Sequence, residues 1–334
     1  MGIDFSTDWT RSLGRVWLAP MTGVSDLPFR QTAAALGARY QATEMVACES
    51  LLASRPDVIR RAAIGGELPV MVVQLVGHDP TLVAQAARLS ASAGAQIIDL
   101  NFGCPAKAVT GQACGSALMR RPDRIEAIVA AACEAVDVPV TVKMRLGWDA
   151  NSPNAAEVAR RAVVAGARAV TVHGRTRMQF YDGVADWAAI RPVAAAAGAP
   201  VVANGDIGDA RSAREALAQS GAQAVMIGRQ AIGRPWIART VETALSGGVA
   251  WEPGPAERLA IVIGHLRRSL AFYGEALGSR IFRKHLAAYV DAAPWPADPQ
   301  ARREARARLC RLPADEIEAA LGSLWTPALE TLAA

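Results

Sequence analysis

The chain has 334 residues, of which 51% are hydrophobic and 20% are charged, so it can bury a large core in one large barrel with a smaller domain or in two to three ordinary domains. No apolar run reaches the length of a membrane span, and the N-terminus lacks the basic and apolar regions of a secretion signal. These features exclude proteins that span a membrane with helices. The formal net charge is +5, and it is unevenly distributed along the chain.

The five cysteines are irregularly spaced (Cys48, Cys104, Cys114, Cys133 and Cys310), which argues against a disulfide framework and for a reducing cytoplasm. None of the four histidines lies two to five residues from a cysteine, so we expect no metal site. The expectation is therefore a cytoplasmic protein, monomeric, with neither a metal nor a membrane partner.

From Arg15 to Arg229 the sequence alternates short runs rich in Val and Ile with Ala-rich, helix-prone segments. The apolar runs occupy 16–20, 40–46, 70–76, 97–101, 140–145, 169–173, 201–204 and 224–228. Eight strands separated by helices predict an α/β fold of the TIM (β/α)8 barrel type, with a doubly wound open sheet as the alternative.

A change in composition between Gly247 and Pro255 predicts a boundary, with a barrel over 1–246, a linker over 247–255 and a helical bundle over 256–334. Between Arg258 and Arg311 there are eleven basic and four acidic residues. Any one basic cluster is most simply a solvated helix face, but three clusters on one small module favour a nucleic-acid partner.

The segment from Ile97 to Lys107 reads I-I-D-L-N-F-G-C-P-A-K, a buried strand followed by a turn at Gly103 and Pro105. Cys104 therefore lies just past the carboxyl end of a strand, where barrels place their chemistry. A free cysteine is often only a small buried hydrophobe. The position of Cys104 between Gly and Pro, near Lys107, favours a reactive role.

Polar residues also follow the other predicted strands, where a barrel would gather them at one mouth. In strand order they are Pro20-Met21, Glu44, Gln74, Asn101 with Cys104, Lys143 with Arg145, His173 with Arg175, Asn204 to Asp206, and Gly228-Arg229. The sequences Asn204-Gly205-Asp206 and Gly228-Arg229 follow strands seven and eight, where barrels bind phosphate, and Lys143 could stabilise negative charge on a reduced ring. The pattern indicates a flavin that carries a phosphate.

Several motifs resemble those of the bacterial tRNA-dihydrouridine synthases, in particular the B-type branch. They are L-A-P-M-T-G-V-S-D-L-P-F-R (18–30), V-V-Q-L-V-G (72–77), N-F-G-C-P-A-K (101–107), G-S-A-L-M-R (115–120), V-K-M-R-L-G-W (142–148), H-G-R-T-R-M-Q-F-Y-D-G (173–183), N-G-D-I (204–207) and M-I-G-R-Q-A-I-G-R-P-W (226–236). The motifs cover nearly all of the predicted barrel in order. The C-terminal region resembles the family only in size, helicity and charge.

This resemblance implies FMN as cofactor, NADPH as reductant and uridine in tRNA as substrate, reduced by hydride transfer to C6 and by a proton from Cys104 to C5. By position, FMN would be held by Pro20, Met21, Thr22, Gln74, Lys143, His173, Asn204, Gly205, Asp206, Gly228 and Arg229. The candidates for binding the uracil or positioning its loop are Asn101, Arg177 and Lys107, and those for binding tRNA are Arg280, Arg283, Lys284, Arg303 and Arg306.

Two other functions compete with this interpretation. An FMN-dependent reductase of a free pyrimidine or another small enone would share the flavin site but would give the basic helical region no role. A non-catalytic RNA-binding or regulatory protein would keep the barrel without turnover, which the combination of Cys104, Lys143 and the flavin set disfavours.

Overall fold

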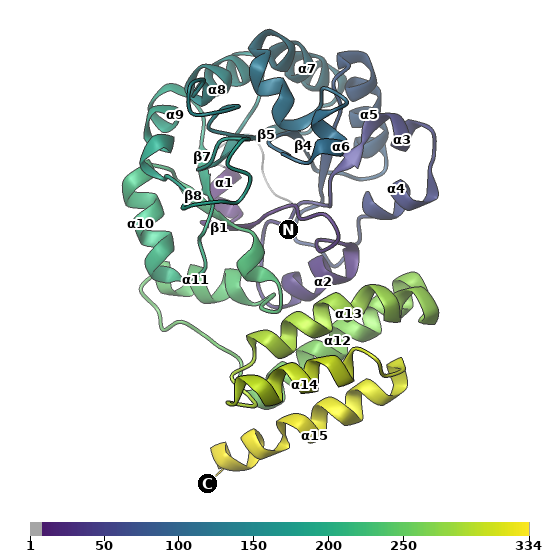
Figure 1. Ribbon diagram of the computed structural model, residues 1–334. Helices are drawn as coiled ribbons and strands as arrows, with labels where there is room; N and C mark the ends of the chain where they lie inside the picture. Colours follow the sequence, from purple (N-terminus) through teal and green to yellow (C-terminus); the bar gives the residue numbers. More distant parts are fainter. Residues whose placement is uncertain (1–8, 334) are drawn as a thin grey trace.

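The computed structural model describes residues 9–333 and contains a parallel eight-stranded sheet curled into a barrel (Figure 1). Its strands are β1 (Val16–Leu18), β2 (Val46–Ala47), β3 (Val72–Val76), β4 (Ile97–Phe102), β5 (Val140–Arg145), β6 (Val170–His173), β7 (Val201–Asn204) and β8 (Ala224–Ile227). Neighbours in the sheet run in the order β1-β8-β7-β6-β5-β4-β3-β2. Seven of the eight predicted strands are thus found within two residues of their expected bounds.

The predicted strand over 40–46 is wrong as a regular strand, although this segment does close the barrel. Gln41 bridges Leu18 of β1, and Ala42 bridges Val72 of β3, so the two ends of the sheet meet through isolated bridges. The Thr43 hydroxyl and the Glu44 carboxylate accept hydrogen bonds from backbone N–H groups of the neighbouring segments. These polar side chains interrupt the ladder, and only β2 follows as a short regular piece.

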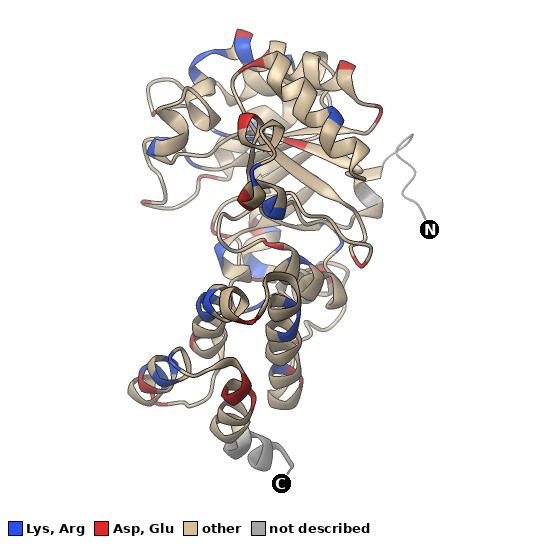
Figure 2. Cartoon of the chain, turned by 90° about the vertical axis from the view of Figure 1, so that its right-hand side faces the viewer, with Lys and Arg blue, Asp and Glu red and all other residues tan. Residues whose placement is uncertain are grey.

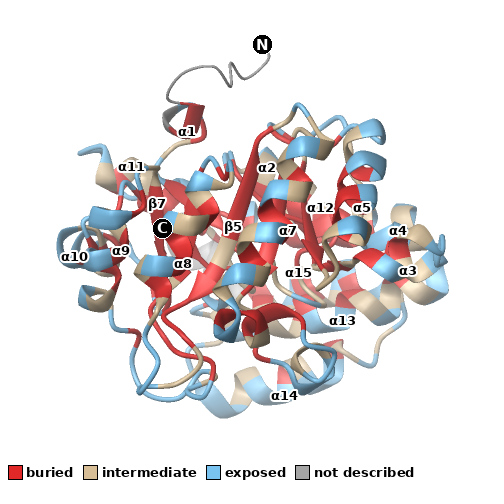
Figure 3. Ribbon diagram, turned by 90° about the horizontal axis from the view of Figure 1, so that it is seen from above, coloured by how far each residue is buried: buried red, intermediate tan, exposed pale blue. Residues whose placement is uncertain are grey.

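Apart from α1, which precedes β1, the helices of this region follow the strands, and most of them cover the outside of the barrel. They are α1 (Trp9–Ser12), α2 (Leu27–Ala35), α3 (Cys48–Leu52), α4 (Pro56–Arg61), α5 (Pro80–Ser92), α6 (Lys107–Thr110), α7 (Pro122–Ala135), α8 (Ala155–Val164), α9 (Arg191–Ala196), α10 (Ala210–Ser220) and α11 (Ile237–Leu245), with short 3-10 turns η1 (Gly115–Arg120), η2 (Ala188–Ile190) and η3 (Arg229–Ala231). The strands are buried and the outer helix faces exposed (Figure 3). No helix within the described part of the chain combines the length and apolar character that a bilayer span requires.

The interior of the barrel changes from apolar at the amino ends of the strands to polar at their carboxyl ends. At the amino end, Trp17 stacks on Tyr40 with ring centroids 4.0 Å apart, and Trp9 of α1 packs 6.4 Å from Trp17. Because side chains of a strand alternate between its two faces, the residues that point inward recur at every second position. As a result of this alternation, the polar mouth is lined by the side chains of Gln74, Asn101, Lys143, His173 and Asn204.

Four helices follow the barrel: α12 (Pro255–Tyr273), α13 (Glu275–Ala292), α14 (Pro299–Leu309) and α15 (Ala314–Ala333). They share a core that includes Leu266, Phe282, Leu309 and Trp325, together with Trp236 from the barrel. In Figure 1 they lie below α2 and α11, with α12 and α13 next to α2. The helical content predicted from the sequence is confirmed, while the division into independent domains stays a prediction.

Replacing Trp17 with Ala should destabilise the protein by about 3–5 kcal/mol, because the substitution leaves a cavity at the closed end of the barrel. Urea denaturation followed by far-UV circular dichroism measures the change. Trp251→Ala serves as a control, since this tryptophan is only partly buried. Equal shifts of the two denaturation midpoints would contradict the packing role of Trp17.

Candidate active site

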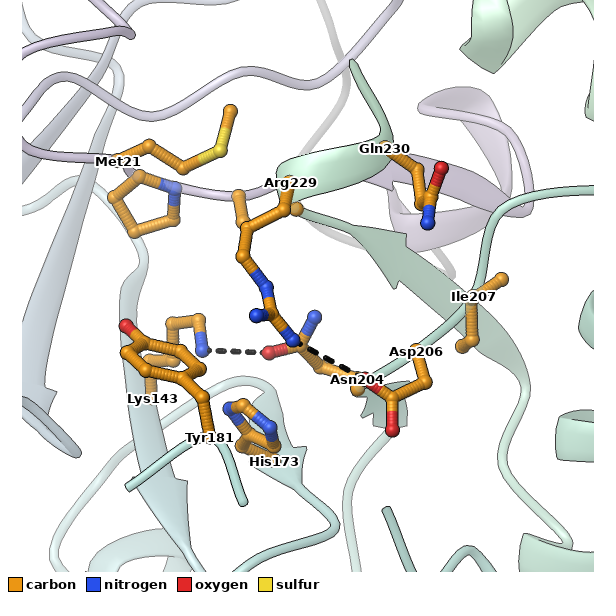
Figure 4. A pocket seen from close by; sticks show the side chains of 13 residues that line it. Met21, Lys143, His173, Tyr181, Asn204, Asp206, Ile207, Arg229 and Gln230 are labelled. Atoms are coloured by element: carbon orange, nitrogen blue, oxygen red, sulfur yellow. Dashed lines mark hydrogen bonds and ion pairs between the residues drawn. The ribbon is translucent and has the colours of Figure 1, made fainter. Parts of the chain in front are cut away.

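Two adjoining cavities of about 360 and 600 Å³ open at the carboxyl ends of the strands. They share the six lining residues Pro20, Met21, Lys143, His173, Tyr181 and Arg229 and therefore form one continuous site. All eleven residues predicted to hold a flavin line one or both cavities. The smaller cavity, beside β7 and β8, is shown in Figure 4.

The smaller cavity presents unpaired backbone donors beside a cation. Within the described residues, the N–H groups of Gly228, Arg229 and Gln230 donate no hydrogen bond to the protein. The Arg229 guanidinium lies over the Tyr181 ring, 4.7 Å from its centroid, and its side chain is more than half exposed. Free N–H groups next to an arginine suit a phosphate.

Asp206 lines this cavity, but its carboxylate is engaged by two arginines. Arg175 is buried and donates to both carboxylate oxygens at 3.0 and 2.6 Å, and Arg229 approaches to 3.3 Å. Burial alone would raise the pKa of Asp206, but the hydrogen bonds from Arg175 and Ala185 and the charges of both arginines lower it overall. A carboxylate would repel a phosphate, so these contacts favour a role for Asp206 in orienting Arg229.

Lys143 and His173 bring a donor pair to the centre of the site. Lys143 Nζ donates to Asn204 Oδ1 at 3.0 Å (Figure 4), and burial together with Arg145 lowers the pKa of this lysine to about 8. Burial and the surrounding cations lower the pKa of His173 to about 2, so its ring is neutral. Arg175 Nη1 lies 3.2 Å from His173 Nε2; because arginine only donates, Nε2 must accept and Nδ1 carries the proton.

A chain of hydrogen bonds runs from the barrel interior to the loop of Cys104. Thr141 Oγ1 and Gln74 Nε2 each donate to Asp99 at 2.6 Å. Asn101 Nδ2 then donates to Gln74 Oε1 at 2.9 Å, and Asn101 Oδ1 accepts from the Cys104 N–H at 2.9 Å. Burial raises the pKa of Asp99 to about 6, although its hydrogen bonds and Lys143 oppose this shift.

The loop of Cys104 is also held from its other side. Arg145 Nε donates to the Gly103 carbonyl at 2.9 Å, and the Ser116 hydroxyl donates to the Cys104 carbonyl at 2.8 Å. Cys104 itself is half-buried and lines the larger cavity with Gln74 and Lys143. Burial raises the pKa of the Cys104 thiol, partly offset by a hydrogen bond from Ala106 and by the charges of Arg145 and Lys143.

The three residues predicted to handle the uracil are placed differently from one another. Asn101 lines the larger cavity, but its side-chain oxygen already accepts from the N–H groups of Gly103 and Cys104. Arg177 lines neither cavity, because its guanidinium is buried between the rings of Trp148 and Phe180, 4.8 and 4.6 Å from their centroids. Lys107 is exposed at the start of α6 and lines neither cavity.

Sequence reasoning assigned no role to several residues that line the site. Arg145 lies two positions after Lys143 on β5, so the two side chains lie on the same inward face of the strand. Tyr181 lines both cavities from the loop after β6, and Met45 and Ile232 complete the wall of the larger one. These three come from irregular segments, where no periodicity in the sequence signals the direction of a side chain.

Basic residues are spread over several of the C-terminal helices (Figure 2). On α13, Arg280, Arg283 and Lys284 are exposed, and a Cβ added at Gly23 in the mouth loop would lie only 3.8 Å from Lys284 Nζ. On α14, Arg306 is paired with Asp291 at 2.8 Å, and Arg303 donates to Gln300. Lys284 of α13 is therefore close to the mouth loop, while part of the α14 charge is neutralised.

A family model described as "Dihydrouridine synthase (Dus)" matches residues 17–312. The chain belongs to the dihydrouridine synthase family. It is 51% identical over 284 residues to a "Probable tRNA-dihydrouridine synthase" of Rhodobacter capsulatus, covering 84% of this chain and 87% of the relative. It is also 44% identical over 274 residues to "tRNA-dihydrouridine synthase B" of Vibrio cholerae, covering 82% and 85%.

A solved structure of a FabK mutant from Thermotoga maritima is a more distant match. It shares 14% sequence identity with a TM-score of 0.41, over 74% of this chain and 67% of the other. The family resemblance inferred from the motifs is thus confirmed by the family model and by the curated relatives.

Alkylation of Cys104 by iodoacetamide should remain slow up to about pH 9 and accelerate above it, because the thiolate is the reactive form and burial raises its pKa above the ordinary value of 9.0. Peptide mapping by mass spectrometry follows this residue separately from the other four cysteines. A rate that already reaches its plateau at pH 7–8 would contradict the protonated state assigned here.

Proposed function

We propose that the protein reduces uridine to 5,6-dihydrouridine in tRNA, using FMN as cofactor and NADPH as reductant. The observation that carries this proposal is the placement of Cys104 in one continuous site with the residues suited to a flavin phosphate and ring. The relatives named as tRNA-dihydrouridine synthases support the choice of reaction and substrate.

The residues at the mouth fit FMN by the chemistry of their donors. The free N–H groups of Gly228, Arg229 and Gln230, with the Arg229 guanidinium, would bind its phosphate. Lys143 and His173 offer donors toward the ring, with Gln74 and Asn204 beside them. A bound flavin would supply the hydride that reduces C6 of the uracil ring.

Cys104 would act as the acid that protonates C5 of the uracil. Its raised pKa keeps the thiol protonated at neutral pH, which is the form an acid requires. After the proton leaves, Arg145 and Lys143 lie near enough to stabilise the thiolate, which regains a proton from solvent. Asn101 and Ser116 hold the loop so that the sulfur keeps its place at the cavity.

The α13 group of Arg280, Arg283 and Lys284 would bind the phosphates of the tRNA beside the mouth. Three exposed cations on α13, with Lys284 close to the mouth loop, distinguish this proposal from a reductase of free pyrimidines, which would not need them. A uridine in folded tRNA is stacked or paired, so it has to turn outward to enter the site, and contacts to its backbone support that conformation.

Cys104→Ala should bind FMN as the wild type does yet lower the rate of dihydrouridine formation by about 10²–10⁴-fold, the contribution of a positioned acid. Single-turnover reduction of unmodified tRNA by the prereduced enzyme measures this rate. Cys133→Ala, a half-buried cysteine on α7, is the matched control and should remain at the wild-type rate. Wild-type turnover by Cys104→Ala would refute the acid assignment.

Replacing Arg280, Arg283 and Lys284 together with Ala should weaken tRNA binding and reduce the slope of log K against log salt by about 3, because each lost phosphate contact contributes about 0.9. Binding is measured by fluorescence anisotropy between 50 and 200 mM salt.

The matched control replaces Arg88, Arg160 and Arg211 with Ala, three exposed arginines on α5, α8 and α10. In the absence of tRNA, NADPH should reduce the FMN-loaded enzyme at the same rate in both triple variants. An equal loss of tRNA affinity in the control would show that only net charge matters, against a site on α13.

A further inference from the structure

Three buried side chains from distant parts of the sequence converge where the barrel meets the C-terminal helices. Asp26 precedes α2, His265 lies on α12 and His285 on α13, and their exposed fractions are 2%, 0% and 1%. One potential ligand atom from each lies within 4.8 Å of the other two. No part of the proposed reaction uses these residues.

Both imidazoles carry a nitrogen that has no partner. The Nε2 atoms of His265 and His285 are fully buried and make no hydrogen bond. Buried polar atoms are nearly always paired, so two unpaired nitrogens in a cluster that also contains a carboxylate call for an explanation. The ring centroids are 4.6 Å apart, and Phe29 stacks on His285 at 5.8 Å and leaves an apolar surround.

The remaining polar atoms of the cluster are already oriented by neighbours. Tyr289 Oη lies 3.0 Å from His265 Nδ1, which allows Nδ1–H to donate to it and leaves the Nε2 lone pair free. The Tyr273 hydroxyl donates to Asp26 Oδ2 at 3.1 Å, and the Phe29 N–H donates to Oδ1. Metal-binding histidines and carboxylates are typically held by such outer hydrogen bonds.

We propose that Asp26, His265 and His285 bind a divalent transition-metal ion between the barrel and the C-terminal helices. Among such ions, this set of ligands is best suited to zinc. Two imidazole nitrogens and a carboxylate oxygen form a donor set that zinc accepts, with a water in the fourth position. Bond lengths of about 2.0–2.1 Å place tetrahedral ligands ~3.4 Å apart, so the side chains draw together by a rotation on binding.

The nearby charges permit a cation at this position. Arg268 and Lys284 oppose it, but Arg268 lies 3.8 Å from Glu67 and Lys284 is exposed to solvent, which screens its charge. The Asp26 carboxylate belongs to the cluster, and Glu44 is close enough to Asp26 to interact with it electrostatically. The buried Arg30 also interacts with Asp26, and its guanidinium donates to the Ser25 and Ala63 carbonyls. The proposal therefore requires that direct coordination by three ligands outweigh the repulsion from these three cations.

A metal here would fasten α12 and α13 to the segment that leads from the mouth loop into α2. This segment begins at Pro20, Met21 and Thr22, which line the larger cavity. The ion would thus fix the proposed tRNA-binding face of α13 relative to the cavity. Spacing within the sequence did not reveal the site, because its ligands are contributed by residues 26, 265 and 285.

The test begins with full-length protein stripped of metal by chelation and then titrated with Zn²⁺ or Co²⁺. We expect one ion per chain after gel filtration, measured by mass spectrometry of metals, and the visible absorption of tetrahedral Co²⁺ without sulfur charge-transfer bands. Failure of the wild-type protein to retain an ion, or a Co²⁺ spectrum showing thiolate ligands, would overturn the proposal.

His265→Ala and His285→Ala should each weaken Zn²⁺ binding by more than ~100-fold, since loss of an outer hydrogen bond alone costs about 10–100-fold. His78→Ala is the matched control at a half-buried histidine elsewhere and should bind as the wild type does. Tyr289→Phe should show the intermediate loss of about 10-fold.

Asp26→Asn keeps an oxygen for the cap of α2 while removing the charge, so it tests the site even where a histidine variant folds poorly. We expect this variant to retain the wild-type circular dichroism spectrum and to bind Zn²⁺ more weakly. Unchanged affinity in Asp26→Asn, or an equal loss in His78→Ala, would exclude the three-residue site.

Discussion

The structure of the site depends on one hydrogen-bonded chain inside the barrel, from Asp99 through Gln74 and Asn101 to the backbone of Cys104. Each member is buried, and each shares its polar atoms with the next, so none can turn without leaving a neighbour unpaired. These hydrogen bonds thereby anchor a loop without regular structure to two adjacent strands, β3 and β4. A thiol held in this way keeps a defined position without being part of the core.

The mouth of the barrel carries more positive than negative charge, which favours the binding of an anion. Lys143, Arg145, Arg175 and Arg229 bring four cations, whereas Asp99 and Asp206 bring two carboxylates. The Asp206 carboxylate is paired with Arg175 and Arg229, and the Asp99 carboxylate accepts hydrogen bonds from Thr141 and Gln74. The surplus of positive charge makes this cavity suitable for a phosphate and for negative charge that develops during reduction.

The barrel and the C-terminal helices are joined through buried polar and aromatic contacts as well as an apolar core. Tyr273 donates to Asp26, His285 stacks on Phe29, and Trp236 of the barrel enters the core of the helices while its Nε1 donates to Glu252 at 2.8 Å. Directional contacts of this kind specify one orientation of α13 beside the mouth. Such a fixed orientation would suit the tRNA-binding role that we propose for α13.

The sequence alone determined the barrel, the inward-facing polar residues and the position of Cys104, because strand parity and turn residues are local properties that follow from the chain itself. It did not determine the irregular closing segment around Gln41, the burial of Arg177 between Trp148 and Phe180, or the meeting of Asp26 with His265 and His285. Each of these depends on which distant segments pack together. Tertiary packing, unlike periodicity, is the sum of many weak contacts across the chain, and so only the folded structure decided them.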